Sequence, residues 1–341
     1  MKKSLLALAV LGTFAGVASA QSSVTIFGVV DLSVAQVKNG DSKLTQMQSN
    51  QLNSNRLGFR GVEDLGGGLS AGFWIEGAMS NENGQAAGQS WQRRSTVSLM
   101  GGFGEIRLGR DYTPSFWNTV FGDVNGANGV GEGLNLVDTT LGSGATTFVR
   151  ANNTVGYFLP SNLGGLYGQA QVAAPQGALA NKYYGARLGY AAGPVDVAVG
   201  YGITKVNVAG NDFKVLNIGG SYNFGVAKIY AFWNNNKFGS LKQDTYEISV
   251  GVPLGQGELR ASYGHSNRKG GTATFNDSDA NLFGAEYVYN LSKRTAMYGG
   301  YGQISNKGAA TFTVLASASG AAVNLAGHKS QAYLVGIRHS F

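Results

Sequence analysis

The sequence predicts an all-β protein, a sixteen-stranded antiparallel transmembrane β-barrel, and three observations support this fold class. Short segments of alternating apolar and polar residues recur along the chain, tight turns join them in pairs, and the stretch ending at Phe341 is itself such a segment. A chain that ends inside a strand has to give that strand a partner. A closed barrel does so by pairing the last strand with the first, which we expect near residues 25–35.

Residues 1–20 have the pattern of a secretory signal peptide. Lys2 and Lys3 precede an apolar run at 5–17, and the A-x-A exit ends at Ala20. The run is too short for a membrane-spanning helix, and small residues follow it. We therefore expect cleavage after Ala20 and a single barrel domain formed by residues 21–341.

Composition excludes several classes of protein. The chain has 53 glycines, 5 prolines and no cysteine, so it can have neither a disulfide framework nor a thiolate metal site. Its formal charge is +7, but the basic residues are spread singly and form no recognisable nucleic-acid module. The glycine-rich stretch at 126–133 does not follow a strand and open a helix, so no nucleotide site is implied. We expect no cofactor, no metal and no nucleic-acid partner.

Alternation and turns give the strand count. The clearest alternation covers residues 195–203, where every second side chain is apolar. Seven tight turns are predicted at 64–67, 101–104, 160–165, 191–194, 223–225, 253–257 and 290–294. These turns join fourteen strands, and the first and last strands bring the number to about sixteen. Longer polar links lie between the hairpins, for example at 39–53, 80–90 and 267–279.

Short turns at one end and long loops at the other are typical of an outer-membrane barrel, with the short turns in the periplasm. Aromatic residues support this orientation, because strands that run into the short turns often end with one. These residues are Tyr157, Tyr190, Tyr222, Phe224, Tyr287, Tyr289 and Phe341. The other face of nearly every strand carries charged or polar residues. Sixteen such strands would enclose a wide polar lumen, so the apolar face is expected to contact lipid.

The alternation assigns charged side chains to the lumen. Leu57 and Phe59 face lipid, for example, so Arg56 and Arg60 face inward. The same reasoning places Arg94, Arg107 and Arg150 inward, whereas Arg93, next to Arg94, is expected to lie near the membrane boundary. Further inward residues are predicted to be Asp31, Glu76, Glu105, Asn152, Arg187, Asp196, Lys228, Glu247, Glu258, Arg260, Glu286 and Arg338.

The longest link, residues 112–149, holds Asp123, Glu132 and Asp138 but no Lys or Arg. A long segment without regular structure is usually functional or disordered. If it folds into the lumen, its carboxylates would oppose the wall arginines and set a transverse field at the narrowest point. If it stays outside, it is a solvated loop. The residues alone leave both possibilities open.

Several segments, in this order, resemble those of the Gram-negative trimeric general porins of the beta-proteobacterial type. They read SSVTIFGVVDLSV, SNRLGFRGVEDLGGGLSAGFWIE, GGFGEIRLGRDYTP, VRANNTVGY and GIRHSF. The resemblance covers the whole chain after the signal peptide. It implies sixteen strands, a homotrimer in the outer membrane and a third extracellular loop folded inward as a constriction.

The resemblance also implies a water-filled channel through which ions and small hydrophilic solutes diffuse passively. It implies an arginine cluster at the constriction, and Arg56, Arg94 and Arg150 match it by motif. It further implies contact with outer-membrane lipid and lipopolysaccharide, and Phe341 resembles the signal that the outer-membrane assembly machinery reads. The excess of lumen arginines favours anions as the preferred ions.

Two other classes of function are less consistent with the sequence. An outer-membrane hydrolase needs a nucleophile beside a base, but no G-x-S-x-G motif occurs. Of the three histidines, His265 and His339 share the phase of lipid-facing residues, and His328 falls in an expected loop. An adhesive surface protein would use loop tips such as 268–271 or 276–281, which are equally explained as solvated loops. We therefore expect no catalytic residue and no enzymatic activity.

Overall fold

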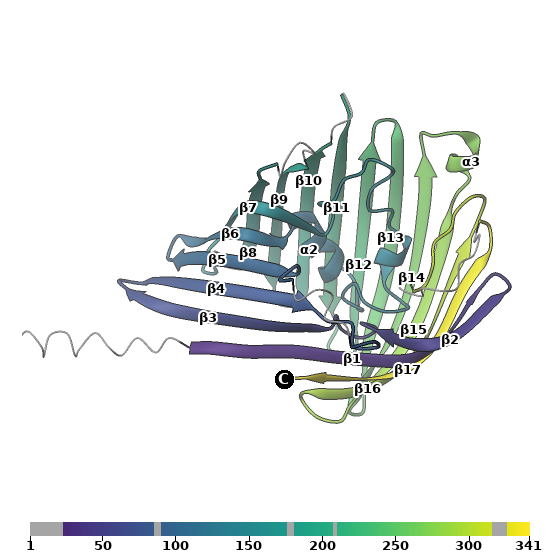
Figure 1. Ribbon diagram of the computed structural model, residues 1–341, viewed down its shortest axis with the longest axis horizontal. Coiled ribbons are helices and arrows are strands. Elements are labelled where there is room, and N and C mark those ends of the chain that lie inside the picture. The colour runs from purple at the N-terminus through teal and green to yellow at the C-terminus, as the bar shows by residue number, and fades with distance from the viewer. Residues whose placement is uncertain (1–22, 85–89, 176–180, 207–209, 316–325) are drawn as a thin grey trace, which may run out of the picture.

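The computed structural model describes residues 23–84, 90–175, 181–206, 210–315 and 326–341. The predicted signal peptide, residues 1–20, lies outside the described residues. Most of the described chain is antiparallel sheet, wrapped into a wall that encloses the short helix α2 (Figure 1). No helix among the described residues has the length and apolarity needed to cross a bilayer.

Seventeen strand segments and three short helices make up the described part of the chain. The strands are β1 (Ser23–Asn39), β2 (Ser42–Ser49), β3 (Arg56–Gly66), β4 (Leu69–Ala78), β5 (Arg94–Gly101), β6 (Gly104–Tyr112), β7 (Arg150–Phe158), β8 (Leu166–Ala173), β9 (Lys182–Ala192), β10 (Val195–Lys205), β11 (Asp212–Asn223), β12 (Lys228–Phe238), β13 (Leu241–Leu254), β14 (Gly257–Lys269), β15 (Ala280–Asn290), β16 (Thr295–Asn306) and β17 (Lys329–Ser340). The helices are α2 (Pro114–Phe121), the 3-10 turn η2 (Gly133–Leu136) and α3 (Ala273–Asn276).

The ring closes where the sequence predicts, between the last strand and the first. β17 pairs with β1 in an antiparallel register that runs from Val29 opposite Ser340 to Asn39 opposite Ser330. The main chain of Phe341 extends the ladder, because its N–H and C=O both bond to Gly28. Figure 1 shows the C-terminus lying beside β1. No edge is left open at this junction, as a barrel in lipid requires.

Seventeen segments form sixteen strands around the ring because β2 and β3 are two parts of one interrupted strand. Both pair with β1: β2 with its second half, from Leu32 to Asn39, and β3 with its first half, from Ser23 to Val29. Residues 50–55, which separate the two segments, leave the ladder and turn toward the inside. We call residues 50–55 the strand insert.

All seven predicted short turns are present, each joining two consecutive strands of the ring. The prediction of a long polar link at 39–53 is wrong in part. Residues 42–49 continue the β1 hairpin as β2 after a tight turn at Gly40 and Asp41. This segment is mostly polar, so it lacks the alternation of apolar and polar residues from which strands are predicted. At the same end of the barrel, Gly239 and Ser240 make another tight turn, so not every connection there is long.

The outward face is apolar, as the alternation predicts. On β17, Tyr333, Val335 and Ile337 are exposed, while the alternating Leu334 and Ala332 are buried. Large apolar side chains are exposed in this way on most strands. A soluble protein rarely exposes an apolar surface of this extent, whereas lipid chains would cover it.

Residues 113–149, between β6 and β7, fold into the barrel, and we call them the inner loop. Helix α2 packs against β8, β9, β10, β11 and β12, and η2 packs against β13, β14 and β15. Apolar contacts fix both ends of the loop. Phe116 near its start and Val137, Leu141 and Phe148 toward its end pack with Phe213 and Val215 of β11. Since the loop follows the wall from β8 to β15, the lumen is bounded by the loop on this side and by β3–β7 on the other.

Glycines allow the inner loop to lie directly on the wall. A Cβ on Gly284 of β15 would be 2.4 Å from the Cα atom of Gly131 in the loop, and a Cβ on Gly302 would be 2.4 Å from the Val130 carbonyl oxygen. The Ser262 hydroxyl donates a hydrogen bond of 2.6 Å to the Gly131 carbonyl at this contact. The loop then reaches the strand insert, where Ser54 bonds Asn128 at 2.9 Å.

Substituting Gly284→Val should displace the inner loop from the wall. The new side chain would overlap the loop backbone at Gly131, and overpacking of this kind costs about 1–3 kcal/mol. We expect faster protease cleavage within residues 126–136 of the folded protein. Gly299→Val on the neighbouring strand is a matched control, because its nearest atoms are at 3.5 Å. Equal cleavage rates in both variants would contradict the close packing inferred here.

Candidate functional site

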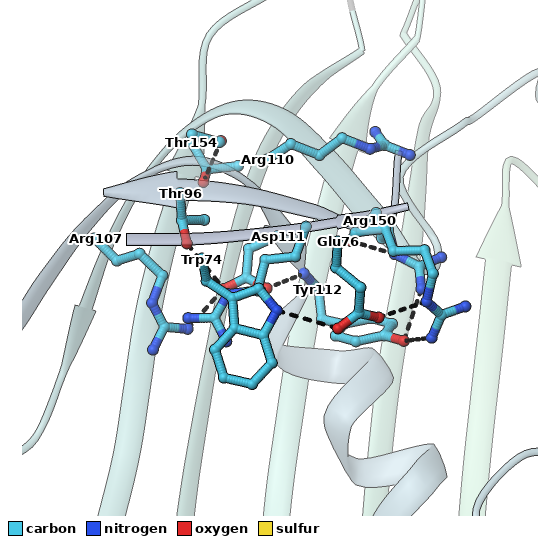
Figure 2. A network of polar contacts seen from close by, with 12 residues as sticks. Trp74, Glu76, Thr96, Arg107, Arg110, Asp111, Tyr112, Arg150 and Thr154 are labelled. Carbon is cyan, nitrogen blue, oxygen red and sulfur yellow. Dashed lines mark hydrogen bonds and ion pairs between the residues drawn. The ribbon is translucent and has the colours of Figure 1, made fainter. Parts of the chain in front are cut away.

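A cluster of arginines lies on the wall opposite the inner loop, around one buried carboxylate. Glu76 of β4 accepts a bond of 2.5 Å from Arg93 Nε, and Arg56 Nη1 lies 3.7 Å from the same oxygen. Trp74 donates its indole N–H to the other carboxylate oxygen at 3.1 Å. Arg150 joins the group through its Nε, which donates to the Arg93 carbonyl at 2.7 Å. We call Arg56, Glu76, Arg93, Tyr112 and Arg150 the Glu76 cluster (Figure 2).

Tyr112 connects two of these arginines to the inner loop. Its hydroxyl accepts hydrogen bonds from Arg93 at 3.0 Å and from Arg150 at 2.7 Å, and the Arg150 guanidinium lies over its ring at 4.2 Å. The same ring stacks on Phe116 of α2, with centroids 5.1 Å apart. The first helix of the inner loop is therefore packed directly against the arginine cluster.

The Glu76 cluster carries a net positive charge. Its three guanidinium groups face a single carboxylate, so the formal charge is three minus one, or +2. All three arginines are held by at least one hydrogen bond, which keeps like charges close together. Such a fixed positive group in a narrow, partly desolvated passage attracts anions and repels cations.

A second cluster, nearer the short-turn end of the same wall, is electrically balanced. Arg107 bonds Asp111 at 2.6 Å and Glu105 at 2.8 Å, and Arg94 lies 3.8 Å from Asp111. Two guanidinium groups thus face two carboxylates. The Arg107 guanidinium also lies 3.9 Å from the ring centroid of Phe158, which fixes its plane. Figure 2 shows this cluster separated from Glu76 by the Trp74 ring.

Arg60 is exposed on this wall and makes no ion pair with a described residue. Its guanidinium lies over the rings of Phe27 and Trp74, at 5.5 and 5.2 Å from their centroids. Together with Arg94 and Arg107 it lines a cavity of about 360 Å³. Its charge therefore adds to the positive character of the wall below the Glu76 cluster.

Asp123 of the inner loop points into the barrel wall. It is only 4 % exposed, and its two oxygens accept N–H groups of Asn125 at 2.7 Å and Gly133 at 3.3 Å. The neighbouring Val124 N–H bonds Ser249 of β13 at 3.1 Å. Burial raises the pKa of Asp123, and the backbone hydrogen bonds oppose the rise. The hydrogen bonds of Asp123 shape the loop, and that of Val124 attaches it to β13.

The other two loop carboxylates lie on different sides of the inner loop. Asp138 is paired with Arg268 of β14 at 3.0 Å and accepts N–H groups of Thr140 and Leu141. Glu132 is half-buried and lines a cavity with Arg93. Burial and, secondarily, the charge of Asp123 raise the pKa of Glu132 to about 8. Glu132 is thus largely protonated at neutral pH, so it offsets little of the positive charge nearby.

The structure brings some of the predicted site residues together and separates others. Arg56 and Arg150 belong to the Glu76 cluster, whereas Arg94 belongs to the balanced cluster with Arg107. The expectation that Arg93 lies at the membrane boundary is wrong, because its side chain is ion-paired inside and the residue is 9 % exposed. Arg93 precedes the first residue of β5, where alternation no longer decides the side-chain direction.

The predicted inward position of Asn152 also differs from the structure. The chain bulges between β6 and β7, with a register shift between Gly109 and Asp111 and a positive φ of 52° at Asn153. At the bulge Asn152 accepts a bond from Arg110, a residue that Figure 2 shows pointing away from both clusters. Simple alternation cannot detect such a bulge, because one extra residue reverses the faces beyond it.

The comparisons with known proteins agree on the kind of molecule. Residues 7–309 match the family model of Gram-negative porins. The chain is 39% identical to outer membrane porin protein 32 of Delftia acidovorans and 29% identical to an outer membrane porin protein of Bordetella pertussis, each covering 100% of both chains.

Among solved structures, an anion-selective porin from Comamonas acidovorans superposes with a TM-score of 0.85 at 36% identity, covering 94% of this chain and 100% of the other. The trimer form of OmpT from Vibrio cholerae shares the fold at 16% identity and a TM-score of 0.68, covering 94% of this chain and 99% of that one.

Substituting Glu76→Gln should destabilise the barrel wall at the Glu76 cluster. The change leaves Arg56 and Arg93 without their carboxylate, and loss of one partner of a largely buried ion pair costs about 2–3 kcal/mol after allowance for partial exposure. We expect a lower midpoint of thermal unfolding. Glu63→Gln on β3, an exposed carboxylate of the same wall, should change the free energy of unfolding by less than about 0.5 kcal/mol. Native stability of the Glu76 variant would show that the three arginines do not depend on this carboxylate.

Proposed function

The chain belongs to the family of Gram-negative porins, and on this premise we propose that its lumen prefers anions among the solutes it admits. The protein is an outer-membrane porin with a β-barrel that forms a passive diffusion channel for ions and small hydrophilic solutes. Family and fold point to a channel rather than an enzyme. We propose in addition that it has no catalytic activity.

The Glu76 cluster is the observation that carries the anion preference. It places a formal charge of +2 on the wall that faces the inner loop, where the lumen is narrowed. None of the loop carboxylates Asp123, Glu132 and Asp138 forms an ion pair with Arg56, Arg93 or Arg150 within the described parts of the chain. A passing anion therefore meets a positive wall that is not neutralised from the opposite side.

The proposed selectivity is electrostatic and needs no conformational cycle. Fixed guanidinium groups raise the local concentration of anions and lower that of cations, and the effect falls with ionic strength because salt screens charges beyond about 10 Å at 0.1 M. The solved porin from Comamonas acidovorans, which is described as anion-selective, supports the same preference here. In our proposal the basic wall consists of Arg56, Arg94, Arg150, Arg60 and Arg107, to which we add Arg93.

We also propose a role for the acidic residues of the inner loop. Asp123 would act mainly by shaping the loop, Asp138 by holding it against β14, and Glu132 would act on the lumen itself. This division follows from their contacts, since the first two are bound to loop backbone or to Arg268.

The relatives support an oligomeric channel, and we propose that this protein is a homotrimer. We further propose that its apolar outer face contacts outer-membrane lipid and lipopolysaccharide. Phe341 would serve as the signal read by the outer-membrane assembly machinery, a role supported by its resemblance to the terminal aromatic of porins. In the folded barrel its main chain is bonded to Gly28.

Removing arginines from the Glu76 cluster should lower anion preference stepwise. A unit charge about 4 Å from the ion path contributes roughly 1 kcal/mol in water-like surroundings, so each of Arg56→Ala, Arg93→Ala and Arg150→Ala should reduce the chloride-to-potassium permeability ratio by a few-fold. The triple variant should lose its anion preference, because the charge of Glu76 then offsets that of Arg60. The reversal potential of planar bilayers in a potassium chloride gradient measures this ratio.

Lys205→Ala is the control for that series. It removes the same charge from an exposed residue at the end of β10, where Lys205 pairs with Asp212 at 2.7 Å. Screening should make its effect on selectivity small. An equal loss of anion preference in Lys205→Ala and Arg93→Ala would mean that overall charge, and not the constriction, sets selectivity.

Anion preference should also decrease between pH 7 and pH 9. The raised pKa of Glu132, about 8, means that its carboxyl gains a negative charge over this range, in a cavity that Arg93 also lines. The chloride-to-potassium permeability ratio measured at pH 6.5, 8 and 9 should therefore fall in the native protein and stay level in Glu132→Gln. A ratio that changes equally in both would exclude Glu132 as the titrating group.

A further inference from the structure

A polar cavity of about 230 Å³ lies beside the Glu76 cluster, where the inner loop meets the strand insert. Its lining includes Gln51 and Asn55 from the insert, Arg93 from the wall, and Asn128, Glu132 and Asn135 from the loop. The cavity is thus built from segments far apart in the sequence. None of the functions described above requires it.

Two residues that line the cavity, Gln51 and Glu132, each carry an oxygen atom with no hydrogen-bond partner among the described residues. Gln51 is only 4 % exposed, and its amide nitrogen donates to the Ser49 carbonyl at 2.9 Å, which leaves the amide oxygen for another donor. That oxygen and Glu132 Oε2 are both buried without a hydrogen-bond partner among the described residues. Burying a polar atom without a partner is unfavourable, so a donor entering here would be favoured.

The cavity also presents a fixed cation. The Arg93 side chain is held at Nε by Glu76 and at Nη2 by Tyr112, so it is oriented before any solute arrives. Arg56 and Arg150 belong to the same cluster and add to its positive charge. A carboxylate is the group that a guanidinium in this position binds best.

We propose that this cavity is a binding subsite for small zwitterions of the α-amino acid class. The solute carboxylate would face Arg93, and its ammonium group, with three N–H donors, would satisfy Gln51 and Glu132. An anion without an ammonium group would leave both acceptors unpaired. A metal ion fits poorly, because no group of three metal-ligating residues is present in the described part of the chain.

The proposal rests on the porin function only in that solutes must reach the cavity from the lumen. The subsite would hold amino acids briefly on the extracellular side of the constriction and so make their passage saturable. Simple monocarboxylates would cross without this step. The conductance of the same preparation reports the channel itself, so failure of the subsite and failure of the channel can be told apart.

The test uses three matched probes, L-alanine, propionate and ethylamine, with the purified folded protein in detergent. Saturation-transfer NMR titrations measure the affinity of each probe. We expect saturable binding of L-alanine at least tenfold tighter than that of propionate, which lacks the ammonium group, or of ethylamine, which lacks the carboxylate. Equal binding of propionate and L-alanine would overturn the proposal in favour of plain anion binding to the arginines. No saturable binding of L-alanine would mean that the cavity holds only water.

Two variants locate the binding in this cavity. At pH 9, where the Glu132 carboxyl is ionised, Glu132→Gln should weaken L-alanine binding at least tenfold without weakening propionate binding. Gln51→Leu, which removes the second acceptor, should weaken L-alanine binding less than Glu132→Gln does. Glu63→Gln is the matched control, because it makes the same chemical change outside the cavity and should bind L-alanine like the native protein. Native affinity in both Glu132→Gln and Gln51→Leu would overturn the assignment, provided that gel mobility before and after heating shows folded barrels.

Discussion

The closure of the backbone ladder between β17 and β1 is the constraint on which the rest of the structure depends. In lipid each unpaired N–H or C=O costs several kcal/mol, so a sheet that spans a bilayer has to be a ring. The pairing of Val29 through Asn39 with Ser330 through Ser340 completes that ring. Only a closed ring encloses a lumen. Because the ring is closed, the arginine wall and the inner loop face each other across that lumen.

Within the ring, small side chains and isolated polar contacts decide how far the lumen narrows. The inner loop can lie on β15 and β16 because Gly284 and Gly302 leave room for its backbone at residues 130 and 131. Hydroxyl and amide groups of the wall, such as Ser262 and Gln243, then satisfy loop carbonyl groups that would otherwise be buried without partners. The loop is therefore attached by many modest contacts spread over several strands.

Local patterns in the sequence are sufficient to predict the barrel. They do not predict the contacts between residues that are distant in the sequence. Tight turns and period-two alternation are properties of a few neighbouring residues, so the seven short turns and the lumen side of Arg56 and Arg94 could be predicted. Strand β2 was missed because it is polar on both faces. Arg93 was misplaced because alternation ends where β5 begins. The position of the inner loop at Asp123 depends on contacts such as that of the neighbouring Val124 with Ser249, 125 residues away, and no local pattern contains that information.

The position of Tyr112 makes the width of the passage and its charge inseparable. This residue ends β6, stacks on α2 and accepts hydrogen bonds from Arg93 and Arg150. A shift of the helix would therefore move the tyrosine and loosen two guanidinium groups at the same time. Evolution or engineering that widens the opening at α2 would also weaken its electrostatic filter, so size exclusion and ion discrimination should vary together among variants of this channel.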